Sequence, residues 1–187
     1  MMDDSEIVQN AKRYAQEKHK NQKRKDGITT YFEHLEGVVN RLKNLGITDK
    51  DILCAAWLHD IIEEGNVTFE QINERFGREI AVLVLSLSKE KNIAIKDREE
   101  QYINQLKNAT FQAKIIKLCD ISANLKDLSN APISKTQKNK QIKKILHYLR
   151  VIKNEISENK SQYPRIQEII DGINIVSVKF KQKPIFI

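Results

Sequence analysis

The sequence predicts an all-α fold, and two observations support that prediction. The 187 residues contain only three prolines and six glycines, so residues that interrupt helices are sparse. Apolar side chains recur at intervals of three and four residues along most of the chain, which is the spacing of one helix face. Apolar residues make up 40% of the composition, enough for one domain with a buried core.

The first half of the chain is predicted to form helices separated by short breaks. We expect helices over residues 5–19, 32–45, 49–62, 69–76 and 79–87, with a polar, basic loop over 21–30. Gly46 is a natural end for the second helix. Thr48 is expected to cap the third helix, with Asp51 in the place of the capping-box glutamate, and Thr68 to cap the fourth.

The second half is predicted to be helical up to a distinct tail. We expect a polar connection over 88–96 and helices over 97–107, 110–128, 134 to about 156 and 165–171. Residues 173–187 alternate apolar and polar side chains, so this tail is predicted to be either a strand or a packed, extended segment. No repeat, linker or change in composition divides the chain, which predicts one domain over residues 1–187.

Composition limits the class of protein. The mean hydropathy is −0.53, and no apolar run approaches the roughly 20 residues that span a bilayer, so no membrane partner is expected. The N-terminus is acidic and lacks the regions of a signal peptide. Cys54 and Cys119 lie in apolar helical contexts that favour small buried residues over a disulfide. These features predict a cytoplasmic protein.

The net charge of +7 suits an anionic partner such as a nucleotide, RNA or an acidic surface. A solvated lysine-rich face explains most of this excess, because many of the lysines lie between residues 135 and 144 on the polar side of a predicted helix. The charge alone leaves these partners open, although nucleic acid is not expected.

Imidazole and carboxylate side chains interrupt the apolar pattern at three places. His34 lies near the start of a predicted helix, His59 and Asp60 follow the apolar run 52–58, and Asp120 ends another apolar run. Such groups are rarely carried into a buried helix without partners. A set of two imidazoles and two carboxylates suits Mn²⁺, Fe²⁺, Co²⁺ or Zn²⁺ better than Ca²⁺, so these four residues are candidate metal ligands.

Helix geometry constrains how this set can act. Neighbouring helix positions diverge by roughly 100°, so His59 and Asp60 can share an ion only at the edge of a face or at a helix end. Glu63 lies three residues beyond Asp60 on the same side and is a candidate to hold or deprotonate a water, with Glu64 beside it.

Simpler roles compete with these assignments. Asp120 could pair with Lys117, the two glutamates could form an acidic helix end, and the His59–Asp60 pair could cap a helix. His19 and His147 are expected to be structural. The basic pair Arg24–Lys25, taken alone, would be a charged loop.

The ordered series of motifs resembles the HD-domain metal-dependent phosphohydrolases. His34, His59–Asp60 and Asp120 match the H…HD…D pattern of that family. The opening Ala15-x-x-x-His19-x-x-Gln22-x-Arg24-Lys25-x-Gly27 and the later Lys117-Leu118-Cys119-Asp120-x-x-x-Asn124-Leu125-x-Asp127 are similar to the hydrolase domains of RelA/SpoT proteins and the small alarmone hydrolases. The resemblance covers about residues 10–150, with a helical segment and tail over 151–187.

The resemblance implies an all-helical HD-domain bundle and hydrolysis of the 3′-pyrophosphate of (p)ppGpp to GDP or GTP and pyrophosphate. It implies Mn²⁺, with other divalent transition metals as alternatives, bound by His34, His59, Asp60 and Asp120. Glu63 and Glu64 would activate water. The substrate contacts would come from Arg24, Lys25, Asn124 and Arg98.

The chain departs from the family pattern at Leu35, Glu64, Ile121 and Asp26. Two alternatives therefore stay open. One is an HD phosphohydrolase for another nucleotide, such as NADPH, a dNTP or a nucleoside monophosphate. The other is a catalytically silent basic module that binds nucleotide or RNA.

Overall fold

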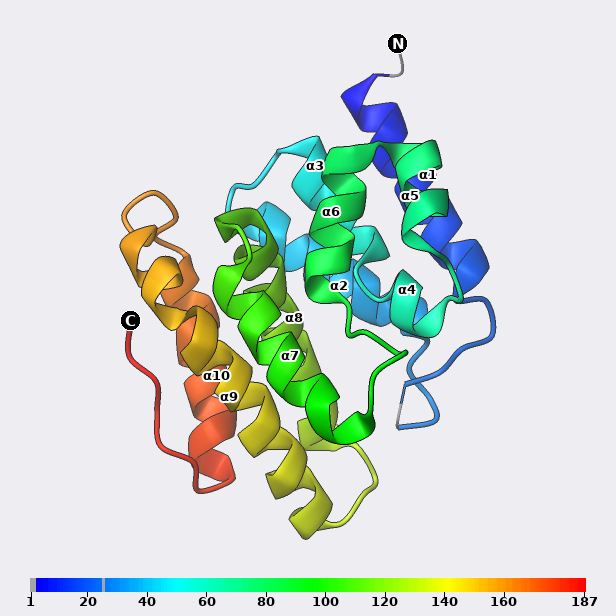
Figure 1. The fold of residues 1–187 in the computed structure, drawn as a ribbon. Coiled ribbons are helices and arrows are strands. Elements are labelled where there is room, and N and C mark those ends of the chain that lie inside the picture. The colour runs from blue at the N-terminus through cyan, green and yellow to red at the C-terminus, as the bar shows by residue number, and fades with distance from the viewer. Residues whose placement is uncertain (1–2, 25) are drawn as a thin grey trace.

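A computed structural model describes residues 3–24 and 26–187, and these residues form an all-helical fold (Figure 1). Apart from one isolated antiparallel bridge between Lys23 and Thr30, the described residues contain no strand pairing. The all-α prediction is thereby confirmed. The helices are α1 (Asp4–Lys18), α2 (Tyr31–Asn44), α3 (Lys50–Leu58), α4 (Ile61–Glu64), α5 (Phe69–Phe76), α6 (Arg78–Leu87), α7 (Ile95–Asn108), α8 (Phe111–Asn130), α9 (Lys135–Glu158) and α10 (Ile166–Lys179).

Capping boxes begin three of these helices. The side chains of Thr30, Thr68 and Ser134 each accept a hydrogen bond from the backbone N–H three residues on. The Glu or Gln at that position bonds back to the N-cap backbone, so two otherwise unpaired donors are satisfied. Gly77 separates α5 from α6 with a φ of 92°, a conformation that favours glycine.

The structure corrects the third predicted helix, which is not continuous over 49–62. It begins one residue later than predicted, because Asp49 rather than Thr48 accepts hydrogen bonds from the first backbone N–H groups. It ends at Leu58, and Asp60 has φ −103° and ψ 0° before α4 starts. His59 and Asp60 therefore lie at a helix end, one of the two geometries that the spacing allowed.

The C-terminal segment is also corrected. The predicted short helix 165–171 continues to Lys179 as α10, and the strand predicted as one option for the tail does not form. The alternation of apolar and polar residues here does not mark a strand, because the apolar Ile175 and Val178 are largely exposed on α10. After α10 the chain runs back without regular structure, and Ile185 packs into the core.

Helix α8 is central to the fold. It packs against α2, α3, α6, α9 and α10, while α9 and α10 lie on one side of the molecule and α1, α5 and α6 on the other (Figure 1). Eleven of its side chains are buried around most of its circumference, as expected for a helix inside a bundle. The polar residues that α8 does carry are therefore placed inside the molecule.

Two composition-based expectations can be compared with the structure. Cys54 and Cys119 are free and buried, and burial raises the pKa of the Cys54 thiol to about 12, so both are inert core residues as predicted. Among the helices of the described residues, none has the length and apolar character needed to cross a bilayer.

Candidate functional site

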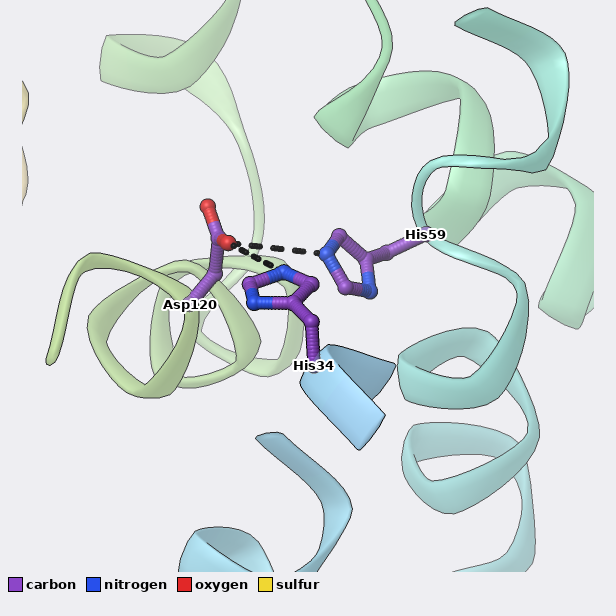
Figure 2. Close-up of side chains that lie close together, drawn as sticks. All are labelled: His34, His59 and Asp120. Carbon is purple, nitrogen blue, oxygen red and sulfur yellow. Dashed lines mark ion pairs between the residues drawn. The ribbon is translucent and has the colours of Figure 1, made fainter. Parts of the chain in front are cut away.

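Three buried side chains from three different helices converge on one point (Figure 2). His34 comes from the first turn of α2, His59 from the end of α3 and Asp120 from the middle of α8. The Asp120 Oδ1 atom lies 3.2 Å from His34 Nε2 and 3.5 Å from His59 Nε2. One ligand atom from each residue lies within 4.8 Å of the others, so the three residues could hold a single metal ion.

Asp60 lies beside this trio. Its Oδ2 atom is 3.5 Å from His59 Nε2 and 3.9 Å from His34 Nε2, and it accepts a hydrogen bond of 2.6 Å from the Tyr31 hydroxyl. Its side chain is 22% exposed, whereas that of Asp120 is 3% exposed. Asp60 makes no capping bond, so the alternative that the His59–Asp60 pair merely caps a helix does not describe it.

The donor set fits a divalent transition metal. Both ring nitrogens of His34 and the Nε2 of His59 are buried without a hydrogen-bond partner among the described residues. Such orphaned nitrogens are rare unless a ligand satisfies them. The Nδ1 of His59 lies 2.8 Å from the Ala56 carbonyl and donates to it, which leaves the Nε2 lone pair facing the cluster. Two imidazoles and two carboxylates match the predicted ligand types.

The charges at the cluster are strongly coupled. Burial opposes ionisation of His59, but the Asp60 and Asp120 carboxylates outweigh it and raise the pKa of His59 to about 9. Burial likewise opposes ionisation of Asp120, yet the Lys117 ammonium and the two histidines hold its pKa well below the usual range. A metal ion bound here would take the place of these protons as the balancing charge.

The cluster opens into a cleft of about 400 Å³ lined by residues from α4, α8, α9 and the loops around them. Three ammonium groups lie along one part of this cleft, those of Lys89, Lys117 and Lys144. Lys117 donates to Asp120 Oδ2 at 2.8 Å, while Lys89 and Lys144 share Glu99. Burial, and then the neighbouring Lys144, lower the pKa of Lys89. These ammonium groups suit an anionic ligand at this part of the cleft, which is also lined by carboxylates, those of Asp26, Asp60, Glu63, Glu64, Asp120 and Asp127.

Glu63 and Glu64 both line the cleft, but their surroundings differ. Glu63 is partly buried and its carboxylate accepts the Lys89 backbone N–H at 2.9 Å, which fixes its orientation. Burial raises the pKa of Glu63, so its carboxylate is a stronger base than a solvated one. Glu64 is exposed, and its backbone carbonyl accepts a hydrogen bond from Gln22.

Arg24 lies at the other end of the cleft. Its guanidinium donates to the Asn124 side chain, lies 3.3 Å from Asp127 and sits 5.1 Å from the centre of the Tyr31 ring. Asn124 in turn donates to Asp120 Oδ1 at 2.6 Å. The predicted Arg24 and Asn124 are therefore brought together and joined to the cluster. Lys25, predicted beside Arg24, falls outside the described residues.

Arg98, predicted as a phosphate contact, is not brought to the cleft. Its guanidinium donates to the carbonyls of Lys91 and Ile93, where it holds the loop before α7. The sequence does not indicate this, because it does not show that the loop over residues 91–93 folds back onto Arg98.

Sequence reasoning missed several residues of the site. Asp127 lies 3.6 Å from His34 Nδ1, and His19, predicted to be structural, stacks on Tyr31 with ring centres 4.6 Å apart. Lys117, predicted as an alternative partner of Asp120, does donate to Asp120, which also faces both histidines. A signal was available, because Lys117, Asp120, Asn124 and Asp127 follow one helix face at intervals of three and four residues.

Three departures from the expected pattern have local explanations. Leu35 and Ile121 are fully buried core residues on α2 and α8, so neither position points into the cleft. The Asp26 carboxylate accepts hydrogen bonds from the backbone N–H groups of Ile28 and Thr29, both at 2.9 Å, and so organises its own loop.

Comparison with known proteins identifies relatives over most of the chain. Residues 11–154 match the HD-domain family. The chain is 38% identical over 118 residues to a guanosine-3′,5′-bis(diphosphate) 3′-pyrophosphohydrolase MESH1 of Danio rerio, a region covering 62% of this chain and 66% of that protein. The identity to the MESH1 protein of Xenopus tropicalis is 37% over 130 residues, 68% of this chain and 73% of that one.

A bacterial relative and two solved structures extend the comparison. A protein of Aquifex aeolicus named guanosine-3′,5′-bis(diphosphate) 3′-pyrophosphohydrolase is 33% identical over 85% of this chain, which spans only 24% of that protein. A metazoan ortholog of SpoT, described as hydrolysing ppGpp, shares the fold with a TM-score of 0.81 at 23% identity and covers 95% of this chain and 97% of its own. The Listeria monocytogenes protein lmo0812 matches with a TM-score of 0.59 at 25% identity, over 81% of this chain and 96% of its own. These matches confirm the resemblance predicted from the motif series.

Proposed function

The chain belongs to the HD-domain family, and we propose that it is a metal-dependent phosphohydrolase that converts (p)ppGpp to GDP or GTP and pyrophosphate. The observation that carries the proposal is the convergence of His34, His59 and Asp120, with Asp60 beside them, at a cleft bordered by ammonium groups. The names of the MESH1 relatives and of the Aquifex protein support the guanosine substrate.

We assign His34, His59, Asp60 and Asp120 as the ligands of a divalent cation, with Mn²⁺ as the proposed metal. When bound, such a cation supplies positive charge to a phosphorus centre and makes a nearby water more acidic. The Asp127 carboxylate faces His34 Nδ1 at 3.6 Å, which is too long for a hydrogen bond.

Glu63 is the proposed general base. Its carboxylate is oriented by the Lys89 N–H, and burial makes it a better proton acceptor than a solvated glutamate. It would take a proton from the attacking water while the bond between the ribose 3′-oxygen and phosphorus breaks. The water oxygen ends on the released pyrophosphate, the 3′-oxygen takes up a proton from solvent and leaves as a hydroxyl, and Glu63 then gives its proton back to solvent. Glu64, exposed in the same cleft, would orient the pyrophosphate.

The remaining residues would bind the substrate. Lys89, Lys117 and Lys144 are placed to neutralise phosphate groups, and three cations in one cleft favour a substrate with several phosphates. Arg24 would stack on the guanine, Asn124 would contact the nucleotide, and Lys25 keeps the role that the family resemblance gives it.

The direct test is hydrolysis of ppGpp by the purified protein loaded with Mn²⁺. We expect release of GDP and pyrophosphate in equal amounts, and loss of both when the metal is removed by a chelator. Intact ppGpp in the presence of folded, metal-loaded protein would overturn the proposal. A parallel panel of NADPH, dNTPs and nucleoside monophosphates tests the other HD substrates.

A catalytically silent binding module makes different predictions. Its affinity for nucleotide or RNA would fall with salt and survive His59→Ala and Asp60→Ala, whereas a hydrolase loses metal and activity with either change.

We also propose that residues 1–187 act as one HD hydrolase domain in the cytoplasm, where both buried thiols stay reduced.

A further inference from the structure

Asp60 differs from the other three proposed metal ligands in how it is held. His34 and Asp120 project from within helices, and His59 is fixed by its bond to the Ala56 carbonyl. Asp60 lies in the break between α3 and α4, makes no capping bond and is partly exposed to the cleft. Its carboxylate therefore needs another contact to stay directed at the histidines.

The Tyr31 hydroxyl provides that contact. It donates a 2.6 Å hydrogen bond to Asp60 Oδ2, the same oxygen that lies 3.5 Å from His59 Nε2 and 3.9 Å from His34 Nε2. An ionised carboxylate can only accept, so the phenol hydroxyl is the donor in this bond.

The Tyr31 ring is itself held firmly. Tyr31 is the first residue of α2, directly after the Thr30 capping box, and its N–H donates to the Gln22 carbonyl at 3.0 Å. The buried imidazole of His19 stacks on the ring at 4.6 Å with an interplanar angle of 7°. His19 is fixed in turn by Gln22, whose side-chain oxygen lies 2.7 Å from His19 Nδ1.

We propose that Tyr31 is a positioning residue for metal binding, whose hydroxyl directs Asp60 toward the His34–His59 pair while the His19 stack fixes its ring. The inference rests on the proposed function, since it takes the cluster as a metal site. Partners that orient ligating side chains are commonly worth about 10- to 100-fold in metal affinity.

The test is a calorimetric titration of metal-free protein with Mn²⁺. Tyr31→Phe removes the hydroxyl and keeps the ring, so we expect the dissociation constant for Mn²⁺ to rise about 10- to 100-fold. Tyr14→Phe is the matched control, because Tyr14 is also a buried tyrosine but packs against Phe76 on α5 and does not line the cleft. Its affinity for Mn²⁺ should stay within about twofold of the unsubstituted protein, since Tyr14 contacts no proposed ligand.

A second pair of variants separates orientation from general loss of structure. His19→Phe keeps an aromatic ring against Tyr31 and should bind Mn²⁺ nearly normally. His19→Ala removes the stack and should weaken binding about 2- to 10-fold. If Tyr31→Phe fails to fold, this pair decides: normal affinity in His19→Ala overturns the inference.

The outcomes distinguish this inference from the proposed function. Equal Mn²⁺ affinity of folded Tyr31→Phe and the unsubstituted protein overturns the role of Tyr31 and leaves the metal site standing. An unsubstituted protein that binds no Mn²⁺ overturns the metal site and this inference together. A selective loss in Tyr31→Phe, absent from Tyr14→Phe, supports both.

Discussion

The two walls of the cleft are built by different means. The helical wall consists of Lys117, Asp120, Asn124 and Asp127, all on one face of α8. The loop wall consists of residues 19–24, 26–31 and 59–64, in which α4 is a single turn of helix. Both walls contribute proposed ligands and substrate contacts. They differ mainly in the contacts that hold these side chains in place.

Backbone geometry alone aligns the helical wall. Its residues are spaced by three and four, and α8 is enclosed by five neighbouring helices. Side-chain bonds along the wall, from Lys117 and Asn124 to Asp120, then fix the carboxylate. We therefore expect the helical wall to keep its arrangement when a single exposed residue beside it is substituted.

The loop wall depends on contacts between distant parts of the chain. Gln22 bonds to the Glu64 carbonyl and Tyr31 bonds to Asp60, so the segment before α2 and the break after α3 hold each other. The Asp26 carboxylate organises the turn between them. The difference teaches that a change on the helical wall should act mainly at the position changed, while a change on the loop wall should also disturb the distant segment that it contacts.

The largest effect is expected for Asp120→Asn on the helical wall. The change removes a proposed ligand charge worth several kcal/mol, so kcat/KM for ppGpp should fall at least about 1000-fold and bound metal should be lost. It also leaves the Lys117 ammonium without its carboxylate, so folding must be checked by circular dichroism. Metal analysis and initial rates are the measurements. The exposed Asp97 on α7 gives the control Asp97→Asn, and activity within tenfold of normal in Asp120→Asn would contradict the assignment.

The next largest effect is expected for Glu63→Gln on the loop wall. Loss of a general base should lower kcat about 100-fold while metal content stays normal. Because burial raises the folded-state pKa of Glu63, its charged form lowers stability above that pKa, and the cost disappears below the pKa of the unfolded chain. The variant should therefore unfold at the same or a higher temperature at pH 7, with no difference near pH 4. A lower unfolding temperature at pH 7 together with normal kcat would contradict both parts.

A smaller effect, confined to binding, is expected for Arg24→Ala. The guanidinium joins the loop wall to Asn124 and Asp127, and hydrogen bonds to charged groups are commonly worth about 1.5–3 kcal/mol. KM for ppGpp should rise about 10- to 100-fold with little change in kcat or in Mn²⁺ affinity. Arg98→Ala is the matched comparison, since Arg98 lies on loop carbonyls outside the cleft, and its KM should change less than about threefold. The reverse order of the two KM values would restore Arg98 as the substrate contact.

The smallest effect is expected at Asp26, where a matched pair separates loop order from charge. Asp26→Ala removes the acceptor for two backbone N–H groups and should raise KM a few-fold, on the order of one hydrogen bond. Asp26→Asn keeps an acceptor oxygen and removes the negative charge, so its KM should be unchanged or slightly lower. Steady-state kinetics on both variants is the measurement. A KM raised as much in Asp26→Asn as in Asp26→Ala would contradict this expectation and show that the charge itself assists binding.

Much of this molecule follows from local sequence. The helices, the caps at Thr68 and Gly77, and the motif series that indicated an HD-domain protein are all properties of short segments. The row of polar residues on α8 also follows from helical spacing, and two of them, Asp120 and Asn124, are predicted site residues. The breaks were harder, and the helix predicted over 49–62 ends at Leu58 because the backbone turns at His59 and Asp60.

Residue type alone could not place side chains that depend on distant partners. Arg24 and Arg98 are both arginines in polar segments, yet only Arg24 lines the cleft. The ammonium groups of Lys89, Lys117 and Lys144 come from three separate segments and meet only in the folded protein. His19 is predicted to be structural, but the sequence does not show that the loop after α1 brings its ring onto Tyr31 at the start of α2.

The sequence by itself determined the helices, the family and the identity of the proposed ligands, because helices form through bonds between residues four apart and motifs are linear. The tertiary structure decided which oxygen faces which nitrogen, that Tyr31 holds Asp60, and which cations border the cleft. These depend on contacts such as Gln22 to Glu64 and Arg24 to Asn124, between residues 42 and 100 positions apart. Bonds over such separations form only when the packed core has brought the loop after α1 together with α4 and α8.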